Sequence, residues 1–180
     1  FYISRALGSE PMSEEVVLTD GDKNAGGIDM KIEIVTDGDN RLGMGHIYQS
    51  IALAGWLSIK SGLQHEISFI TKSGEKVRNL IKAHGYVVRH FPDDIEILSA
   101  LRNQKPDRII FDKLDVSPEL ARSIKEEIKA KLVLCTNLTE ANRYADITII
   151  ADIGSNFKNV YKKDAMSGQV QFIGPRYWLL

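Results

Sequence analysis

The sequence predicts an α/β fold, in which a parallel β-sheet carries helices on both faces. Three observations lead to this prediction. The chain has 180 residues, the length of about one domain. From Lys31 onward, short runs rich in β-branched residues alternate with stretches of helical periodicity, which is the pattern of βα units. Runs such as RIIF and ITII are predominantly apolar, as expected of strands that helices cover on both faces.

The predicted strands are short and separated by segments long enough to hold a helix. In chain order we expect them at residues 32–35, 66–70, 86–88, 108–111, 132–134 and 147–150, with a candidate seventh strand at 170–173.

The predicted helices rest on apolar periodicity and on capping signals. A helix at residues 46–61 follows the first strand, and the next helix, at 75–84, places Val77, Leu80 and Ile81 at i, i+3, i+4 spacing. Two further starts carry N-cap residues, namely Asp93 and Asp94 for a helix reaching residue 102, and Ser117 followed by Pro118 for the helix after the fourth strand.

The first 30 residues differ in composition from the rest. Residues 8–30 contain six acidic side chains, one basic side chain and five Gly or Pro residues, which is typical of a linker. We therefore expect residues 1–30 to be a linker or the tail of an upstream segment, with a candidate short strand at 16–18. Residues 31–180 form the predicted domain. Because the chain starts at Phe1, we treat it as a possible fragment.

Charge and cysteine content exclude several classes of function. The net charge is −1, so the chain has no cationic excess for binding nucleic acid. Cys135 is the single cysteine, which excludes an internal disulfide and a thiolate zinc cage and favours the reducing cytoplasm. His65, His84 and His90 are scattered, so we expect no metal site. No apolar run reaches the roughly 20 residues of a membrane helix.

The loop TDGDNRLGMGH, residues 36–46, holds the most distinctive residues. It follows the first strand, at the edge of a parallel sheet where ligands bind. Gly43 and Gly45 would allow positive φ angles and a close backbone approach to a ligand, although a simple glycine-rich turn explains them equally well. Tyr48 stands where a dinucleotide fingerprint needs its third glycine. The Walker, GxSxG and HExxH motifs are all missing, and we expect no cofactor.

His46 is the candidate catalytic residue of this loop. It lies in the first turn of the predicted helix, where the helix dipole disfavours imidazolium, so we expect a neutral ring near pH 7. His46, Gln49 and Ser50 share one helical face by their spacing and would form a polar strip. A lone histidine at a helix end is ordinarily a surface or capping residue, and that alternative stays open at this point.

Three segments resemble a known family. TDGDNRLGMGHIYQSIALA resembles the RADxxxxxGxGHxxRxxxLA segment of the nucleotide-sugar hydrolases of pseudaminic acid biosynthesis and of the related spore coat polysaccharide biosynthesis proteins. FIGPRYWLL, at the end of the chain, resembles the stretch that precedes the second domain of that family. IIFDKLD and KLVLCTNL lie where the family has its aspartate-containing strand ends. The resemblance covers about residues 31–180.

The resemblance implies the N-terminal half of a GT-B-like protein, in which two Rossmann-like domains face each other and the second one holds most of the nucleotide. It places the catalytic histidine at His46, the loop glycines at Gly43 and Gly45, and the early aspartate at Asp37. The family arginine three positions after the histidine is Gln49 in this chain, and the aspartate-rich strand end is replaced by residues 135–137, Cys-Thr-Asn. These departures leave the sugar open.

The function implied is hydrolysis of a nucleotide-activated sugar such as a UDP-sugar, with His46 activating the attacking water. Other polar residues near the same edge are candidate substrate-binding residues, and these are Asp37, Arg41, Gly43, Gly45, Gln49 and Asp112. Two alternatives remain open: a glycosyltransferase in which an acceptor hydroxyl replaces the water, and a non-catalytic Rossmann-like module of a larger fusion. A second domain in the complete protein is expected.

Overall fold

A computed structural model describes residues 30–38, 43–60, 64–151 and 169–174. Its centre is one seven-stranded sheet with the order β3-β2-β1-β4-β5-β6-β7, in which every neighbouring pair is parallel. The strands are β1 (Met30–Thr36), β2 (His65–Thr71), β3 (Val87–His90), β4 (Arg108–Asp112), β5 (Lys131–Cys135), β6 (Ile147–Ile150) and β7 (Val170–Ile173).

The helical segments connect these strands. They are α2 (Gly45–Lys60), α3 (Glu75–Ala83), α4 (Asp94–Gln104), α5 (Pro118–Ser123), the π-helix η1 (Ile124–Ile128) and the short 3₁₀-helix η2 (Glu140–Tyr144). The predicted parallel sheet is confirmed, and each strand and helix predicted within residues 31–180 is present with ends that differ by a few residues. The sequence did not indicate η1 and η2.

Two predicted helix starts show the expected capping geometry. Asp93 caps α4 by accepting hydrogen bonds from the backbone N–H groups of Ile95 and Glu96, both at 2.9 Å. Ser117 caps α5, and Pro118 occupies its first turn. A side chain at the N-cap satisfies backbone donors that have no partner within the helix, so these short polar signals fix where each helix begins.

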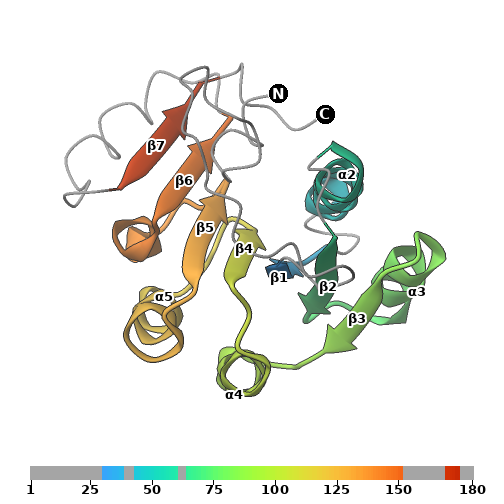
Figure 1. Ribbon diagram of the computed structural model, residues 1–180, viewed down its shortest axis with the longest axis horizontal. Coiled ribbons are helices and arrows are strands. Elements are labelled where there is room, and N and C mark those ends of the chain that lie inside the picture. Colours follow the sequence, from blue (N-terminus) through green and yellow to red (C-terminus); the bar gives the residue numbers. More distant parts are fainter. Residues whose placement is uncertain (1–29, 39–42, 61–63, 152–168, 175–180) are drawn as a thin grey trace, which may run out of the picture.

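Helices cover both faces of the sheet, and each face has its own apolar core (Figure 1). The cluster beneath α2 and α3 includes Ile32 and Ile34 of β1, whereas the cluster beneath α4 and α5 includes Val35 of the same strand. Successive side chains of a strand point to opposite faces, so a strand buried on both sides must be apolar at consecutive positions. This requirement explains the apolar runs in the sequence.

The strand order reverses direction between β1 and β4. β2 and β3 lie on one side of β1 in the sheet, and β4 lies on its other side. Loops that leave β1 and β4 at their carboxyl ends therefore diverge to opposite faces of the sheet, and ligands of open α/β sheets bind at such a reversal point. Thr36 and Asp112, the last residues of these two strands, are register partners at this point.

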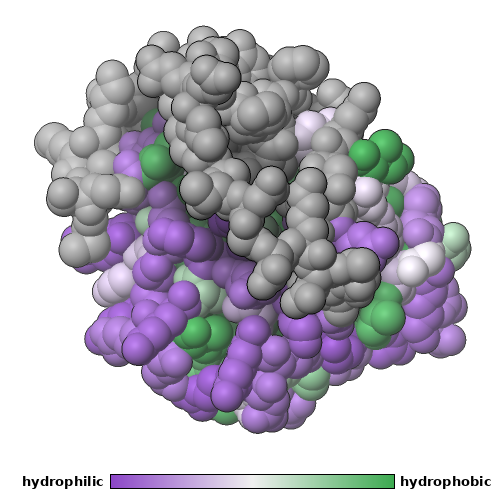
Figure 2. Space-filling view, viewed as in Figure 1, coloured by the Kyte–Doolittle hydropathy of each residue, from purple (hydrophilic) through white to green (hydrophobic). Residues whose placement is uncertain are grey.

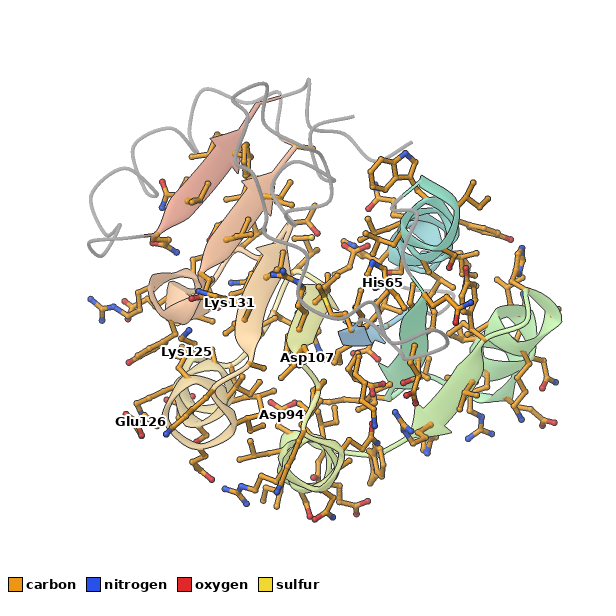
Figure 3. All side chains as sticks on the ribbon, in the orientation of Figure 1. His65, Asp94, Asp107, Lys125, Glu126 and Lys131 are labelled. Atoms are coloured by element: carbon orange, nitrogen blue, oxygen red, sulfur yellow. The ribbon has the colours of Figure 1, made fainter. Side chains whose placement is uncertain are left out.

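Ion pairs hold the opposite, amino-terminal edge of the sheet. The Asp107 carboxylate accepts a hydrogen bond from the Lys31 backbone N–H at 2.7 Å. Asp146 pairs with Lys125 at 2.7 Å and with Lys131 at 3.6 Å, and accepts a bond from the Leu132 N–H. Figure 3 shows Lys125 and Lys131 beside each other, near the start of β5.

Apolar side chains on the visible face lie singly among hydrophilic ones (Figure 2). Among the described helices, none has both the length and the apolar character needed to cross a bilayer. The predicted linker and its candidate strand at 16–18 lie outside the described residues. Met30, the last residue of that predicted segment, is the first residue of β1.

Candidate functional site

The candidate site centres on Asp112, which ends β4 and is buried, with 1% of its side chain exposed. Its Oδ1 lies 2.9 Å from His46 Nδ1, and its Oδ2 accepts a hydrogen bond from Ser50 Oγ at 3.1 Å. Thr136 Oγ1 lies 3.1 Å from Oδ1, 2.7 Å from the Cys135 carbonyl oxygen and 3.4 Å from His46 Nδ1. Its single proton can be donated to the carboxylate or to the carbonyl oxygen. Three side chains from α2 and the end of β5 thus surround one buried carboxylate.

The topology brings these residues together. α2 follows β1, β4 is the neighbour of β1 across the reversal point, and β5 is the next strand along. His46 and Ser50 are four residues apart, so they lie on the same face of α2 and both reach Asp112. Two of the three residues in the polar strip predicted for α2, His46 and Ser50, thus contact the Asp112 carboxylate.

The third residue of that strip, Gln49, is buried at 8% exposure. Tyr48, by contrast, is 53% exposed on α2. Gln49 and Ser50 are therefore buried near the start of α2, while His46 is partly exposed.

Thr136 adopts a backbone conformation that is rare for its type. Its φ is +56°, in the left-handed region, where a β-branched residue is an outlier. Such strain costs of order 1–3 kcal/mol and persists where the surroundings hold it. Here the Thr136 N–H donates to the Ile149 carbonyl at 2.8 Å, and the next residue, Asn137, is fully buried and accepts a bond from the Val116 N–H at 3.0 Å. The strained residue sits beside the candidate catalytic histidine.

The pKa of His46 is raised above its ordinary value of 6.5, which is opposite to the direction expected from the helix dipole. The hydrogen bond that the Asp112 carboxylate accepts from His46 is the largest cause, and it outweighs the opposing effect of partial burial. A helix dipole contributes about 0.3–1 kcal/mol. A hydrogen bond to a charged group contributes about 1.5–3 kcal/mol, so the buried carboxylate prevails. The expected direction of the shift was wrong because the argument considered only the helix that carries the histidine.

The pairing also fixes which ring nitrogen is available. Because Nδ1 faces the Asp112 carboxylate, the proton of the neutral ring belongs on Nδ1, and Nε2 keeps its lone pair. The His46 side chain is 18% exposed, and among the described residues Nε2 has no hydrogen-bond partner. His46 can therefore accept a proton at Nε2 while Asp112 stabilises the resulting imidazolium.

Asp37 lies near this site with both carboxylate oxygens engaged. Oδ1 accepts bonds from the Lys72 N–H at 2.7 Å and from Thr71 Oγ1 at 3.1 Å, and Oδ2 pairs with Lys113 Nζ at 2.9 Å. Burial works to raise the pKa of Asp37, but the charge and hydrogen bond of Lys113 and the bonds from Lys72 and Thr71 lower it overall. Asp37 ties the carboxyl ends of β1, β2 and β4 together.

Lys113 is a residue that the sequence reasoning missed. It is buried at 8% exposure and also lies 3.3 Å from the exposed Asp115. Its position directly after Asp112, at the end of a buried strand, was the available signal. Asp37, which follows β1 and is 76 residues away in the chain, pairs with Lys113 and offsets the cost of burying its charge.

The two loop glycines differ from each other. Gly43 uses the conformational freedom of glycine, with a φ of +81°, whereas Gly45 has no positive φ and begins α2. The glycine whose lack of a side chain matters most for packing is Gly38. A Cβ at Gly38 would lie 2.7 Å from Ile47 Cγ1 and 3.0 Å from the Gly43 carbonyl oxygen. The predicted substrate-binding residue Arg41 lies outside the described residues.

The described residues contain no group of three or more His, Cys, Asp or Glu side chains that could hold a metal ion. Cys135 is a free, buried thiol, and burial together with the charge of Asp112 raises its pKa.

Comparison with known proteins relates the chain to one curated protein and to glycosyltransferase folds. An uncharacterised protein of Methanocaldococcus jannaschii is 36% identical over 151 residues, which is 84% of this chain and 31% of that protein. The chain thus spans about a third of this relative's length. No protein-family profile matches the chain.

Two solved structures share the fold. MurG of Acinetobacter baumannii matches with a TM-score of 0.55 and 10% identity, over 79% of this chain and 45% of MurG. The lipopolysaccharide outer core galactosyltransferase WaaB matches with a TM-score of 0.52 and 15% identity, over 80% of this chain and 45% of WaaB. The chain therefore has the Rossmann-like fold found in the N-terminal half of GT-B glycosyltransferases.

We predict that an NMR titration of His46 gives a pKa above 6.5, and that Asp112→Asn lowers it markedly. The paired imidazolium stabilises the folded state below pH 6.5, the unfolded pKa, and this contribution disappears as the pH rises through the folded pKa. Asp115→Asn is the control, because Asp115 is exposed and acts on His46 only through its charge. A pKa at or below 6.5, or equal shifts in the two variants, would show that Asp112 does not hold the ring.

Gly38→Ala should lower the free energy of unfolding by about 1–3 kcal/mol, because the added methyl group overpacks the contact with Ile47. Gly45→Ala is the matched control. A Cβ there meets no atom of the described residues within 4 Å, and alanine favours helix formation. Urea unfolding of both variants measures the difference, and equal stabilities would argue against close packing at Gly38.

Proposed function

We propose that this chain is the N-terminal half of a GT-B-type enzyme that transfers the sugar of a nucleotide-activated donor, with His46 as general base. The observation that carries the proposal is the His46–Asp112 pair, which lies where the strand order reverses and leaves Nε2 unpaired among the described residues. Ligands of open α/β sheets bind at this reversal point. The fold shared with a galactosyltransferase supports the sugar-transfer chemistry.

In the proposed reaction an acceptor hydroxyl gives its proton to His46 Nε2 while its oxygen attacks the anomeric carbon of the donor. The bond between that carbon and the phosphate oxygen breaks, and its electron pair leaves with the nucleotide. A phosphate leaving group needs little protonation, so a single base suffices, whereas ordinary glycosidases require two carboxylates. Such a base contributes roughly 10²- to 10⁴-fold to the rate.

The other residues take supporting roles in this proposal. Asp112 orients His46 and stabilises the imidazolium, and Ser50 and Thr136 hold Asp112 in place. Burial of Asp112 at 1% exposure favours this positioning role over the substrate contact expected from the sequence. Asp37, whose oxygens already have partners, is assigned to joining the strand ends.

Contacts with the donor or acceptor are assigned to the groups around the first turn of α2. Gly43, Gly45, Gln49 and Arg41 remain the candidates, because they flank His46 in the chain.

Hydrolysis of a nucleotide-sugar is the second candidate, and the sequence resemblance to the pseudaminic acid pathway hydrolases favours it. The chemistry is the same with water as the nucleophile. Both reactions need a second domain to hold the nucleotide, and both fold neighbours are more than twice as long as the part that matches here. A non-catalytic role for the module is the outcome if no turnover is found.

We place the enzyme in the cytoplasm, where the buried free thiol of Cys135 would stay reduced.

For the complete protein, His46→Ala should lower kcat by at least about 10²-fold and change substrate affinity little, because the lost group acts in the transition state. The activity of the unsubstituted protein should fall as the pH drops through the pKa of His46, since the protonated ring cannot act as a base. The matched control is His84→Ala, which removes an exposed histidine at the end of α3.

Product analysis separates the two candidate reactions. A sugar joined to an acceptor identifies transfer, and free sugar identifies hydrolysis. Full activity of the His46→Ala protein would overturn the proposed mechanism in both cases.

A further inference from the structure

A buried polar side chain of α2, that of Gln49, makes no hydrogen bond to the described residues. Gln49 is 8% exposed, so its neighbours cover almost all of its surface. Its carboxamide oxygen and nitrogen are nevertheless not sealed from solvent, in contrast to the unpartnered atoms Glu33 Oε1 and Arg89 Nε. Buried polar groups are almost always hydrogen-bonded, so this carboxamide needs a partner that the described residues do not supply.

The geometry of α2 places this carboxamide beside His46. Side chains three residues apart on a helix are neighbours, with about 5–6 Å between their Cβ atoms. Helical side chains also lean toward the helix N-terminus, so Gln49 leans toward the first turn, where His46 lies. Because α2 follows β1, this turn lies at the carboxyl edge of the sheet, where ligands of open α/β sheets bind. A substrate group at His46 is therefore within reach of Gln49.

The buried charged groups at this edge already have partners. The Asp112 carboxylate pairs with His46 at 2.9 Å, and Lys113, the cation that follows Asp112, pairs with Asp37 at 2.9 Å. The first turn of α2 contains no acidic residue. A carboxylate or phosphate group would find no unpaired cation among these residues, and an ammonium group would find no unpaired carboxylate. Since burying an unpaired charge is costly, these pairs favour an uncharged substrate group beside Gln49.

The carboxamide itself selects a group that both donates and accepts hydrogen bonds. It carries one acceptor oxygen and two N–H donors in a single plane. A hydroxyl group also donates and accepts, so two adjacent hydroxyls of a sugar ring match the oxygen and the nitrogen of one carboxamide. An apolar group would leave the carboxamide buried without a partner, which is costly.

We infer that Gln49 is a specificity-determining residue, which binds adjacent uncharged hydroxyls of the sugar that reacts at His46. One hydroxyl donates to the carboxamide oxygen, and the other accepts from the carboxamide nitrogen. The role assigned to Gln49 rests on the function proposed above, since it takes the substrate at His46 to be a sugar. It adds the class of group that is recognised, and it disfavours sugars that carry a carboxylate or an ammonium group at that position.

The test follows the side-chain NH₂ signals of Gln49 by NMR in the full chain, and their loss in Gln49→Met assigns them. The uncharged probes are the methyl β-glycosides of D-galactose and D-glucose. The charged probes are the methyl β-glycosides of D-glucuronate and D-glucosamine, which keep the same ring. At least one uncharged glycoside should shift the Gln49 signals saturably at about 1–10 mM, and both charged ones should bind at least about tenfold more weakly.

Gln49→Met should weaken binding of the uncharged glycoside at least about tenfold, as measured from the backbone amide shifts of α2, because it removes the donor and the acceptor and keeps the length of the side chain. Tyr48→Phe is the matched control, since it removes a polar group from a neighbouring residue that is 53% exposed. In the complete protein, Gln49→Met should raise KM at least about tenfold and change kcat much less, whereas His46→Ala acts on kcat.

Three results would overturn the role of Gln49: no saturable shift with either uncharged glycoside, equal or tighter binding of a charged one, or equal binding by Gln49→Met. If Gln49→Met does not fold, the shifts of the unsubstituted protein and of Gln49→Glu decide, and Gln49→Glu should also bind the uncharged glycoside more weakly. A complete protein without turnover refutes the proposed function, while the NMR result still decides whether Gln49 binds a sugar. Turnover with an unchanged KM in Gln49→Met refutes the role of Gln49 and leaves that of His46 intact.

Discussion

A carboxylate buried at the end of a central parallel strand needs hydrogen-bond donors, and the rest of the candidate site is arranged around the donors that Asp112 finds. His46 and Ser50 reach it from one face of α2, which fixes the rotation of that helix against the sheet. Thr136, directly after β5, also contacts Asp112, and its backbone has a left-handed φ angle. The strand order brings these side chains to Asp112, because β1, β4 and β5 are neighbours in the sheet. The same contacts that satisfy the buried charge also fix the ring and raise the pKa of His46.

The strands and helices could be predicted from the sequence because their signals are local. Apolar runs mark strands that are buried on both faces, and Asp93 and Ser117 mark helix starts through bonds to residues two or three positions away. The raised pKa of His46 could not be predicted in this way, since its partner Asp112 is 66 residues distant in the chain. The roles of Lys113 and Thr136 could not be predicted either. The role of Lys113 depends on the neighbouring strand, and that of Thr136 depends on a backbone angle that threonine disfavours.

Two buried carboxyl groups on neighbouring strands, Glu33 and Asp112, differ in their hydrogen bonding. Both oxygens of Asp112 have protein partners, whereas one oxygen of Glu33 has none among the described residues. The Asp112 carboxylate holds the side chains of α2, whereas the Glu33 carboxyl group is held by Ser68 and Arg89.

The claim that Asp112 holds His46 with Nε2 free to accept a proton is tested most directly by the tautomer of the neutral ring. Imidazole nitrogen chemical shifts, recorded well above the pKa of His46, distinguish a proton on Nδ1 from one on Nε2. The geometry predicts the Nδ1–H tautomer, since Nδ1 lies 2.9 Å from the Asp112 carboxylate. A dominant Nε2–H tautomer would contradict this account, because it would leave no lone pair on the exposed side of the ring.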